Sequence, residues 1–263
     1  MSRNIAVNMP LPGAIPFPLQ IAAYIVVVLV ATIAMTTANV LLLGRGRRVL
    51  QERMLPLFSR MLLRIAGVRF QERETHHLFE AIRSSPVIVI ANHRSTLDVP
   101  LVCALGLPNT RFFLSVWLKR LIPVHIISSQ LGTFWTPEQT DSPGRERCFK
   151  HATRVLKATG DNVFLTPEGI RTGLKGIGAF NRGAFHLAIA LGRPIVPMFI
   201  ETPDDVSPDL GYRPGRGKVN VSYGPAIDTS GWRLETLPEH IAAVRGIYTA
   251  RLNEPHVSHP TTH

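Results

Sequence analysis

Beyond residue 66 the chain alternates short apolar runs with longer amphipathic stretches, which is the pattern of an α/β domain. The apolar runs predict strands at residues 68–71, 87–91, 111–116, 134–136, 162–165, 195–200 and 218–223. Apolar positions at helical spacing predict helices at 75–82, 96–105, 117–122, 145–158, 182–190 and 237–252. The Pro- and Gly-rich stretch 202–217 is typical of a loop within one domain rather than of a linker.

The first 66 residues are dominated by one long apolar run. No charged residue occurs between Asn4 and Gly44, and residues 19–43 are almost wholly apolar. As a helix this run would reach about 37 Å, enough to span a bilayer with some tilt. It is too long for the apolar part of a signal peptide. Prolines at 10, 12, 16 and 18 favour an extended start, so a re-entrant hairpin competes with a spanning helix as the interpretation.

Positive charge follows the apolar run directly. Arginines at 45, 47, 48, 53, 60, 64, 69 and 73 outnumber Glu52 and Glu72, which predicts that this side of the membrane is the cytoplasm. Residues 54–65 place arginines among apolar residues at near-helical spacing, which predicts an interfacial helix at about 50–66. An amphipathic helix packed on the domain would give the same pattern. We therefore expect a membrane-anchoring segment at 1–66 and an α/β domain at 67–263, on the cytoplasmic side of the cell (inner) membrane.

Composition narrows the class of partner. The chain has 263 residues, of which 45% are hydrophobic, enough to bury one α/β core with an appendage. Its net charge of +11 favours an anionic partner. The arginines cluster beside the apolar run and lack interleaved aromatic residues, which argues for membrane lipid rather than nucleic acid. Cys103 and Cys148 form no CxxC pair and are expected to be packing residues.

The segment 91–98, Ala-Asn-His-Arg-Ser-Thr-Leu-Asp, carries the strongest chemical signal. A histidine can take a proton from a hydroxyl near neutral pH, and an aspartate on its other ring nitrogen fixes the tautomer. Along a continuous helix His93 and Asp98 would lie roughly 140° apart. They meet only if His93 lies in the turn and Asp98 in the first turn of a helix, with Ser95 as its N-cap. A loop histidine beside a charge at a helix start would show the same residues.

Two later segments also follow predicted strands. In 166–173, Gly169 allows close backbone approach, Arg171 offers a planar fork suited to phosphate, and Glu168 is placed to bind a substrate hydroxyl or to hold Arg171. A turn with an exposed ion pair would have the same composition. Arg182 opens the next helix, and Pro197 lies in an apolar strand that lines either a hydrophobic slot or only the core. Open α/β sheets place their sites at strand ends, so the segments together predict one site.

The combination Asn-His-x4-Asp, Pro-Glu-Gly-x-Arg and an Arg-Gly-led helix followed by Pro-Ile-Val-Pro resembles the glycerolipid acyltransferases. The similarity covers about residues 45–225 and is greatest to bacterial-type 1-acylglycerol-3-phosphate (lysophosphatidic acid) acyltransferases. It implies a glycerol-phosphate-acyltransferase-like mixed sheet flanked by helices, with an N-terminal membrane helix or hairpin. It also implies acyl transfer from acyl-CoA or acyl carrier protein to a lysophospholipid hydroxyl, giving phosphatidic acid, with neither a metal nor another cofactor.

The resemblance also implies roles for individual residues. His93 would be the general base and Asp98 its orienting partner, in a direct transfer without an acyl-enzyme. Glu168, Gly169 and Arg171 would bind the glycerol phosphate of the acceptor, with Arg182 as a further substrate contact. The residues around Pro197 would border the acyl-chain pocket. The expected partners are membrane lipids, the lysophospholipid acceptor and acyl carrier protein.

One motif departs from the family pattern. The segment 132–138, Gly-Thr-Phe-Trp-Thr-Pro-Glu, keeps the glycine and apolar pair but lacks the arginine that helps to grip phosphate in the family. Arg145 or Arg147 from the following helix, or Lys119 or Arg120 from the preceding segment, are the candidate replacements. The departure leaves open a different acceptor, such as a lyso-ornithine lipid. A non-catalytic membrane lipid-binding protein and a hydrolase are the competing functional classes, although no G-x-S-x-G segment is present.

Overall fold

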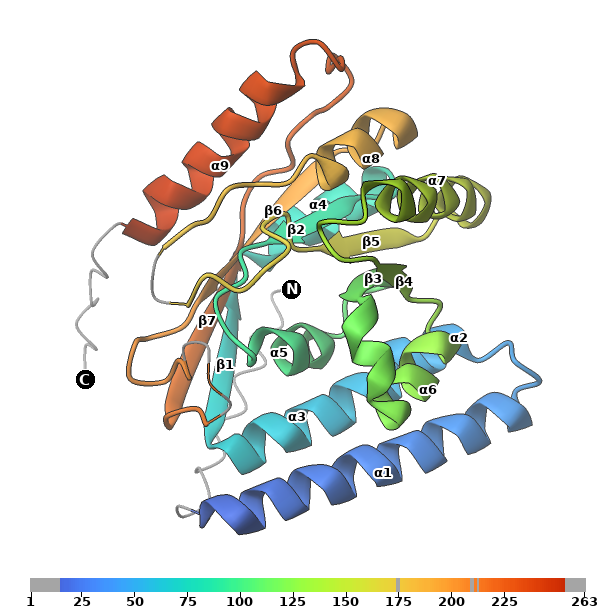
Figure 1. The fold of residues 1–263 in the computed structure, drawn as a ribbon, viewed down its shortest axis with the longest axis vertical. Helices are drawn as coiled ribbons and strands as arrows, with labels where there is room; N and C mark the ends of the chain where they lie inside the picture. The colour runs from blue at the N-terminus through green and yellow to red at the C-terminus, as the bar shows by residue number, and fades with distance from the viewer. Residues whose placement is uncertain (1–14, 174–175, 209–210, 212, 254–263) are drawn as a thin grey trace.

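A seven-stranded mixed sheet forms the centre of the protein (Figure 1). The computed structural model describes residues 15–173, 176–208, 211 and 213–253. The strand order is β1-β7-β6-β2-β5-β3-β4, and every neighbouring pair is parallel except β6 and β7. The strands are β1 (Val68–Arg73), β2 (Ile88–Ala91), β3 (Thr110–Ser115), β4 (Phe134–Thr136), β5 (Asn162–Leu165), β6 (Ile195–Glu201) and β7 (Gly217–Tyr223). The fold class and all seven predicted strands are confirmed.

Five of the predicted helices are also present within a few residues. They are α4 (Thr75–Ser84), α5 (Asp98–Leu105), α7 (Ser142–Thr159), α8 (Gly183–Leu191) and α9 (Leu237–Asn253). The prediction at 117–122 was wrong: this stretch is a 3₁₀ turn, η2 (Val116–Arg120), followed by a separate helix, α6 (Ile122–Gln130). Pro123 lies in the first turn of α6, where a missing N–H costs little, and therefore starts this helix instead of ending the one before it.

Two apolar layers pack on the two faces of the sheet. Along β2, Val89 and Ala91 face the layer that includes α4 and α5, while Ile88 and Ile90 face the layer that includes α7, α8 and α9. This alternation is the two-residue period of a strand whose two faces are both covered. Because β2, β5 and β3 are parallel, their carboxyl ends lie at the same edge of the sheet, between the two helical layers.

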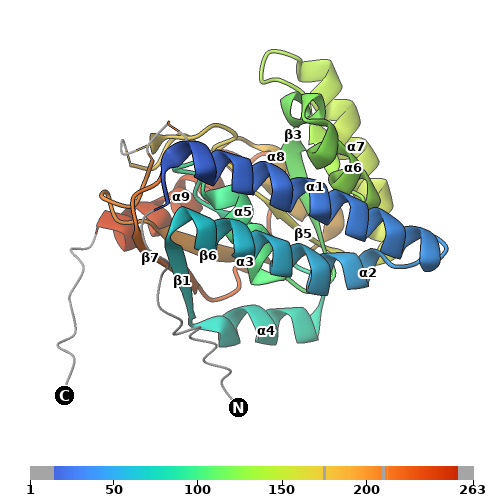
Figure 2. The ribbon, with the colours of Figure 1, turned by 90° about the horizontal axis from the view of Figure 1, so that it is seen from below.

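The N-terminal segment forms a helical hairpin that lies along the domain (Figures 1 and 2). Helix α1 (Phe17–Leu41) is followed by one helical stretch made of α2 (Arg47–Val49), the π-helical turn η1 (Leu50–Met54) and α3 (Leu55–Ala66). Of the described helices, only α1 is long and apolar enough to cross a membrane. Most residues in its most apolar stretch are not buried by the rest of the protein. Pro18 lies inside the first turn of α1, so an extended chain at that position was a wrong prediction; prolines 10 and 12 lie outside the described residues.

Helices α1 and α3 are packed on the domain. Helix α1 packs against α3 and α6, and the Gln20 and Gln130 side-chain amides donate hydrogen bonds to Ile65 O and Thr36 Oγ1 at 2.8 Å each. Helix α3 packs on α5, and its Leu63 and Ala66 belong to the apolar layer on that side of the sheet. The helices before residue 66 and the sheet after it therefore share one hydrophobic core.

A buried carboxylate joins this N-terminal segment to the sheet. Asp161, before β5, is 1% exposed, and its carboxylate oxygens accept hydrogen bonds from Arg47 Nη2 and Arg111 Nε at 2.6 Å each. Burial alone raises the pKa of Asp161, but hydrogen bonds from Arg111 and Thr159 and the charge of Arg47 outweigh burial and hold this pKa below its ordinary value. Asp161 thus connects α2, β3 and β5.

We expect Asp161→Asn to lower the free energy of unfolding by about 3–5 kcal/mol near neutral pH, because it leaves two arginines without their buried counter-charge. Since the folded-state pKa is depressed, this stabilisation is fully present above the unfolded-state pKa of about 4 and is lost as pH falls through the lower folded-state pKa. Denaturant unfolding at several pH values measures both effects. The exposed Asp205→Asn serves as control, and an equal effect of the two changes would contradict the assignment.

Candidate active site

His93 and Asp98 meet at the carboxyl end of β2. His93 lies in the loop after the strand, Asp98 is the first residue of α5, and His93 Nδ1 is 2.8 Å from Asp98 Oδ2. Asp98 is almost fully buried, whereas the His93 side chain is 19% exposed. When Nδ1–H donates to Asp98, Nε2 is the nitrogen left to accept a proton. The pair therefore has the arrangement of a general base with an orienting carboxylate.

Backbone N–H groups complete the environment of Asp98. Its Oδ2 also accepts hydrogen bonds from Arg94 N at 2.8 Å and Ser95 N at 3.0 Å. The predicted N-cap role of Ser95 was wrong, because the cap position is Leu97 and no side chain caps α5. Ser95 Oγ instead accepts a hydrogen bond from Leu97 N at 3.1 Å. The Asp98 carboxylate thus holds the backbone of the turn 93–98 in place and orients the imidazole of His93 at the same time.

Glu168 holds the backbone of the His93 loop. Its Oε1 accepts a hydrogen bond from His93 N at 2.8 Å, and its Oε2 accepts one from Gly178 N at 2.7 Å. The pKa of the Glu168 carboxyl lies above its ordinary value, because burial of the side chain raises this pKa by more than the hydrogen bonds lower it. Thr172 N returns a hydrogen bond to His93 O at 2.9 Å. The loops after β2 and β5 are therefore connected in both directions.

Gly169 lets the second loop turn closely beside α8. Its φ is +70°, and a Cβ there would lie 2.8 Å from Asn181 Nδ2. Asn181 Nδ2 donates hydrogen bonds to Pro167 O at 3.0 Å and to Glu168 O at 2.8 Å. A side chain at position 169 would therefore strain the backbone and displace the amide that shapes the turn.

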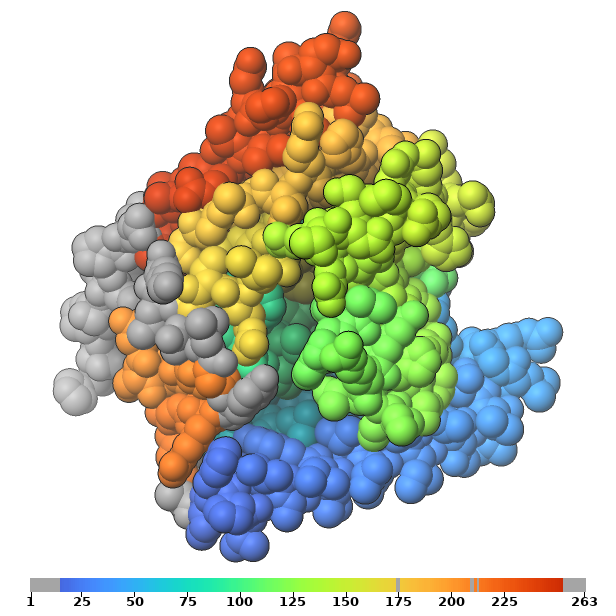
Figure 3. Space-filling model, viewed as in Figure 1, coloured from blue at the N-terminus to red at the C-terminus, as the bar shows by residue number. Residues whose placement is uncertain are grey.

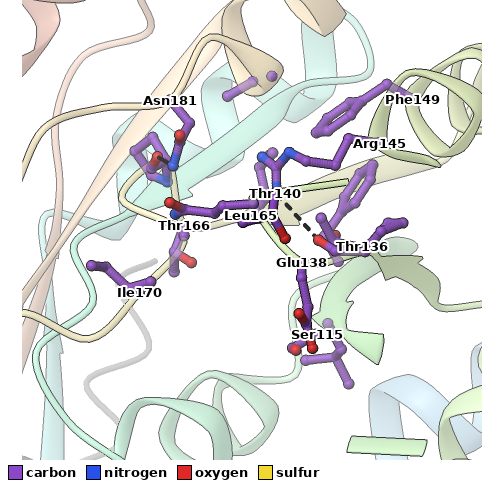
Figure 4. A pocket seen from close by; sticks show the side chains of 18 residues that line it. Ser115, Thr136, Glu138, Thr140, Arg145, Phe149, Leu165, Thr166, Ile170 and Asn181 are labelled. Atoms are coloured by element: carbon purple, nitrogen blue, oxygen red, sulfur yellow. Dashed lines mark hydrogen bonds between the residues drawn. The ribbon is translucent and has the colours of Figure 1, made fainter. Parts of the chain in front are cut away.

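A cavity of about 400 Å³, which we call the polar cavity for the hydroxyl, amide and charged groups in its wall, opens beside this loop (Figure 4). Among the described residues that line it, Arg145 of α7 is the one cation and Glu138 the one carboxylate. Figure 4 shows Arg145 reaching into the cavity between Asn181 on one side and Thr136 on the other. The remaining lining comes from the ends of β3, β4 and β5, the loops that follow β4 and β5, α7 and the start of α8: Phe113, Leu114, Ser115, Pro137, Gln139, Thr140, Phe149, Leu165, Thr166, Pro167, Gly169, Ile170, Gly183 and Ala184.

A second cavity, of about 290 Å³, is almost wholly apolar. It lies between α1, α3 and the turn that carries Asp98, and Thr96 and Leu97 of that turn form part of its wall. Figure 3 shows a hollow on one face of the molecule, bordered by the yellow residues after β5, the green residues around 115–130 and the dark blue α1. The apolar cavity thus adjoins the His93–Asp98 turn directly, whereas the polar cavity adjoins it through the loop after β5, whose Glu168 binds His93 N. His93 and Asp98 themselves line neither cavity.

The structure does not bring all the other predicted site residues to the two cavities. Arg171 is half-buried, between Gly169 and the residues 172–173 that pair with the His93 loop. Arg182 is exposed at the start of α8 and lines neither cavity. Pro197 is buried within β6, opposite Ile90 of β2, and also lines neither cavity. Of the candidate replacement cations, only Arg145 lines the polar cavity.

Several lining residues were missed by the sequence reasoning. Ser115, Thr136 and Asn181 line the polar cavity because each lies at a strand end or just before α8. The signal that could have found the first two is their position directly after apolar strands that pair in parallel, since such ends share one edge of the sheet. The described residues contain no group of three or more His, Cys, Asp and Glu side chains placed to hold a metal ion.

Comparison with known proteins identifies the family of this chain. The sequence model of the Acyltransferase family matches residues 67–201, which include both loops and all of β2 to β6. The chain belongs to this acyltransferase family.

The chain is also similar to individual acyltransferases and, in its fold, to one solved structure. The alpha form of 1-acyl-sn-glycerol-3-phosphate acyltransferase from Ovis aries is 25% identical over 76% of this chain and 69% of its own, and the human beta form is 27% identical over 79% and 73%. A relative from Limnanthes alba is 24% identical over 63% of this chain, which spans only 58% of that enzyme. The fold resembles the crystal structure of a 1-acyl-sn-glycerophosphate acyltransferase from Thermotoga maritima, with a TM-score of 0.66, 18% identity, and coverage of 90% and 99%.

Glu168→Ala tests whether this carboxylate positions the His93 loop. We expect a lower melting temperature, because two backbone N–H groups lose their partner at about 1–3 kcal/mol each. We also expect acyl-transfer kcat to fall about 10²-fold through displacement of the imidazole. The control is Glu146→Ala, which removes an exposed carboxylate paired with Lys150. A raised KM for the acceptor at an unchanged melting temperature would show that Glu168 contacts substrate instead.

Proposed function

We propose that the protein transfers a fatty acyl group from a thioester to the free hydroxyl of 1-acylglycerol-3-phosphate, giving phosphatidic acid. The observation that carries this proposal is the His93–Asp98 pair at 2.8 Å. The polar cavity that contains Arg145 opens beside the loop after β5, whose Glu168 binds His93 N. The names of the relatives supply the acceptor. The proposed donor is acyl-CoA or acyl carrier protein, and the proposal invokes neither a metal nor another cofactor.

The pair suits a direct displacement. His93 Nε2 takes the proton of the acceptor hydroxyl as its oxygen attacks the thioester carbonyl carbon. The C–S bond then breaks, and the departing sulfur takes the proton back from the imidazolium. Asp98 stabilises the imidazolium in between and holds the ring by its Nδ1. No nucleophilic side chain is needed, which agrees with the lack of a G-x-S-x-G segment.

The two recesses suit the two ends of an amphiphilic substrate. Arg145 offers a planar fork to the phosphate of the acceptor in the polar cavity. The apolar cavity between α1, α3 and Leu97 suits a fatty acyl chain, a role that the family resemblance implied for the residues around Pro197. The apolar cavity adjoins the His93–Asp98 turn, and the polar cavity adjoins the loop that is hydrogen-bonded to this turn. The acceptor hydroxyl and the thioester carbonyl would therefore meet beside His93.

The exposed apolar face of α1 supports attachment to a membrane. Ile25, Leu29 and Ile33 follow one another at four-residue spacing along that face and are exposed. Because α1 also packs along α3 and α6, we favour a helix embedded beside the domain in one leaflet over an isolated spanning helix. The arginines that follow α1 place the domain on the cytoplasmic side in this proposal.

We expect His93→Ala to lower acyl transfer by about 10²–10⁴-fold, the usual contribution of a positioned general base. The assay follows a radiolabelled acyl thioester into lyso-lipid in membranes that contain the protein. His76→Ala, an exposed histidine on α4, is the matched control and should retain full activity. Undiminished transfer in His93→Ala would remove the general-base role.

We expect Arg145→Ala to raise the acceptor KM roughly 10- to 100-fold, the value of a hydrogen bond between charged groups. Arg147→Ala, two residues further along α7 and exposed, should leave the KM unchanged. Because Glu138 in the same cavity would suit the ammonium of a lyso-ornithine lipid, both acceptors are assayed. A preference of the unaltered protein for the phosphate-free acceptor would overturn the lysophosphatidate assignment while leaving acyl transfer intact.

A further inference from the structure

The segment formed by η2 and α6 exposes apolar side chains next to α1. Trp117, Leu121, Ile122 and Ile126 are 48%, 44%, 70% and 36% exposed. Ile122 and Ile126 are four residues apart and therefore share one face of α6. An exposed tryptophan with a cluster of aliphatic residues is unusual for a surface that meets only water.

The opposite face of α6 fixes this segment in place. Ile127 and Leu131 pack with Met35 of α1 and Leu50 of η1 in one apolar cluster. The Gln130 side chain donates a hydrogen bond to Thr36 Oγ1 of α1 at 2.8 Å. Helix α6 is thus held alongside α1, and its outward apolar residues extend the exposed apolar surface of that helix.

Charge and shape agree with an anionic lipid surface as the partner. Lys119 and Arg120 are exposed between Trp117 and Ile122, and cations beside apolar residues are attracted to anionic headgroups. Tryptophan is enriched at the level where headgroups meet acyl chains. In Figure 3 the green residues around 115–130 and the dark blue α1 border the same hollow. A membrane that touches both would therefore cover the opening of the site.

We propose that η2 and α6, through Trp117, Leu121, Ile122 and Ile126, form a second lipid-contacting element beside α1. Together they seat the opening of the site on the bilayer, so that an amphiphilic substrate enters from the membrane. This inference rests on the proposed attachment of α1 to the membrane. It does not depend on which lyso-lipid is acylated.

The direct test is quenching of tryptophan fluorescence by brominated lipid acyl chains. The full-length protein is bound to phosphatidylcholine and phosphatidylglycerol vesicles, and the signal of Trp117 is the difference between the unaltered protein and Trp117→Phe. We expect this signal to be largely lost in brominated vesicles. Two probes in the Trp117→Phe background serve as references: Ile25→Trp on α1, which should be quenched, and Leu234→Trp in the loop before α9, far from α1, which should not.

Quenching of Ile25→Trp without quenching of Trp117 would overturn the second element and leave the anchoring by α1 standing. Quenching of none of the probes would overturn both. Because these measurements need no turnover, failure of the proposed acyl transfer would be seen separately.

A double change, Ile122→Ser with Ile126→Ser, tests the consequence for delivery of substrate. We expect activity on a vesicle-borne acceptor to fall about tenfold, and activity on a monomeric short-chain acceptor to be retained. A loss confined to acyl carrier protein as donor, with Trp117 unquenched, would show that the surface binds the acidic carrier protein and would overturn the lipid assignment.

Discussion

The hydrogen bond from His93 N to Glu168 is the contact on which the site depends. It joins two loops that follow neighbouring parallel strands, and one buried carboxylate satisfies a backbone donor in each loop region. Asp98 does the same within the first loop, since it accepts two backbone N–H groups as well as the imidazole. The imidazole is thus oriented by groups that are themselves fixed by backbone geometry, which is the condition for a base to act without reorganisation.

Of the two cavities near this turn, one is lined by polar groups and the other almost wholly by apolar side chains. The ends of β3, β4 and β5 and the start of α7 supply hydroxyl, amide and guanidinium groups to the polar cavity. The N-terminal helices line the other cavity almost wholly with apolar side chains, and its wall includes Leu97 of the turn itself. A water-soluble substrate would need only the first cavity. In the proposed function, the second cavity holds a fatty acyl chain.

The N-terminal hairpin is part of this division and is rigidly tied to the domain. Arg47 reaches Asp161 before β5, Leu63 and Ala66 belong to the apolar layer on one face of the sheet, and Gln130 of α6 binds α1. A flexible tether would let the domain orient freely above a membrane. A hairpin held by a buried ion pair and by shared core residues instead fixes the orientation of the hollow relative to α1.

The sequence by itself determined the strands and most helices of this protein, and the tertiary structure decided which side chains meet. All seven strands follow from local apolar runs, and the spacing of His93 and Asp98 defines the one local geometry in which they meet, because both signals come from neighbours along the chain. The partner of Glu168 lies 75 residues away, so no local pattern shows that this carboxylate binds a backbone N–H instead of Arg171 or substrate. The same reason explains why Arg145 rather than Arg147 lines the polar cavity, and why Pro197 lies in the sheet: the docking of α7 and the pairing of β6 with β2 decide both.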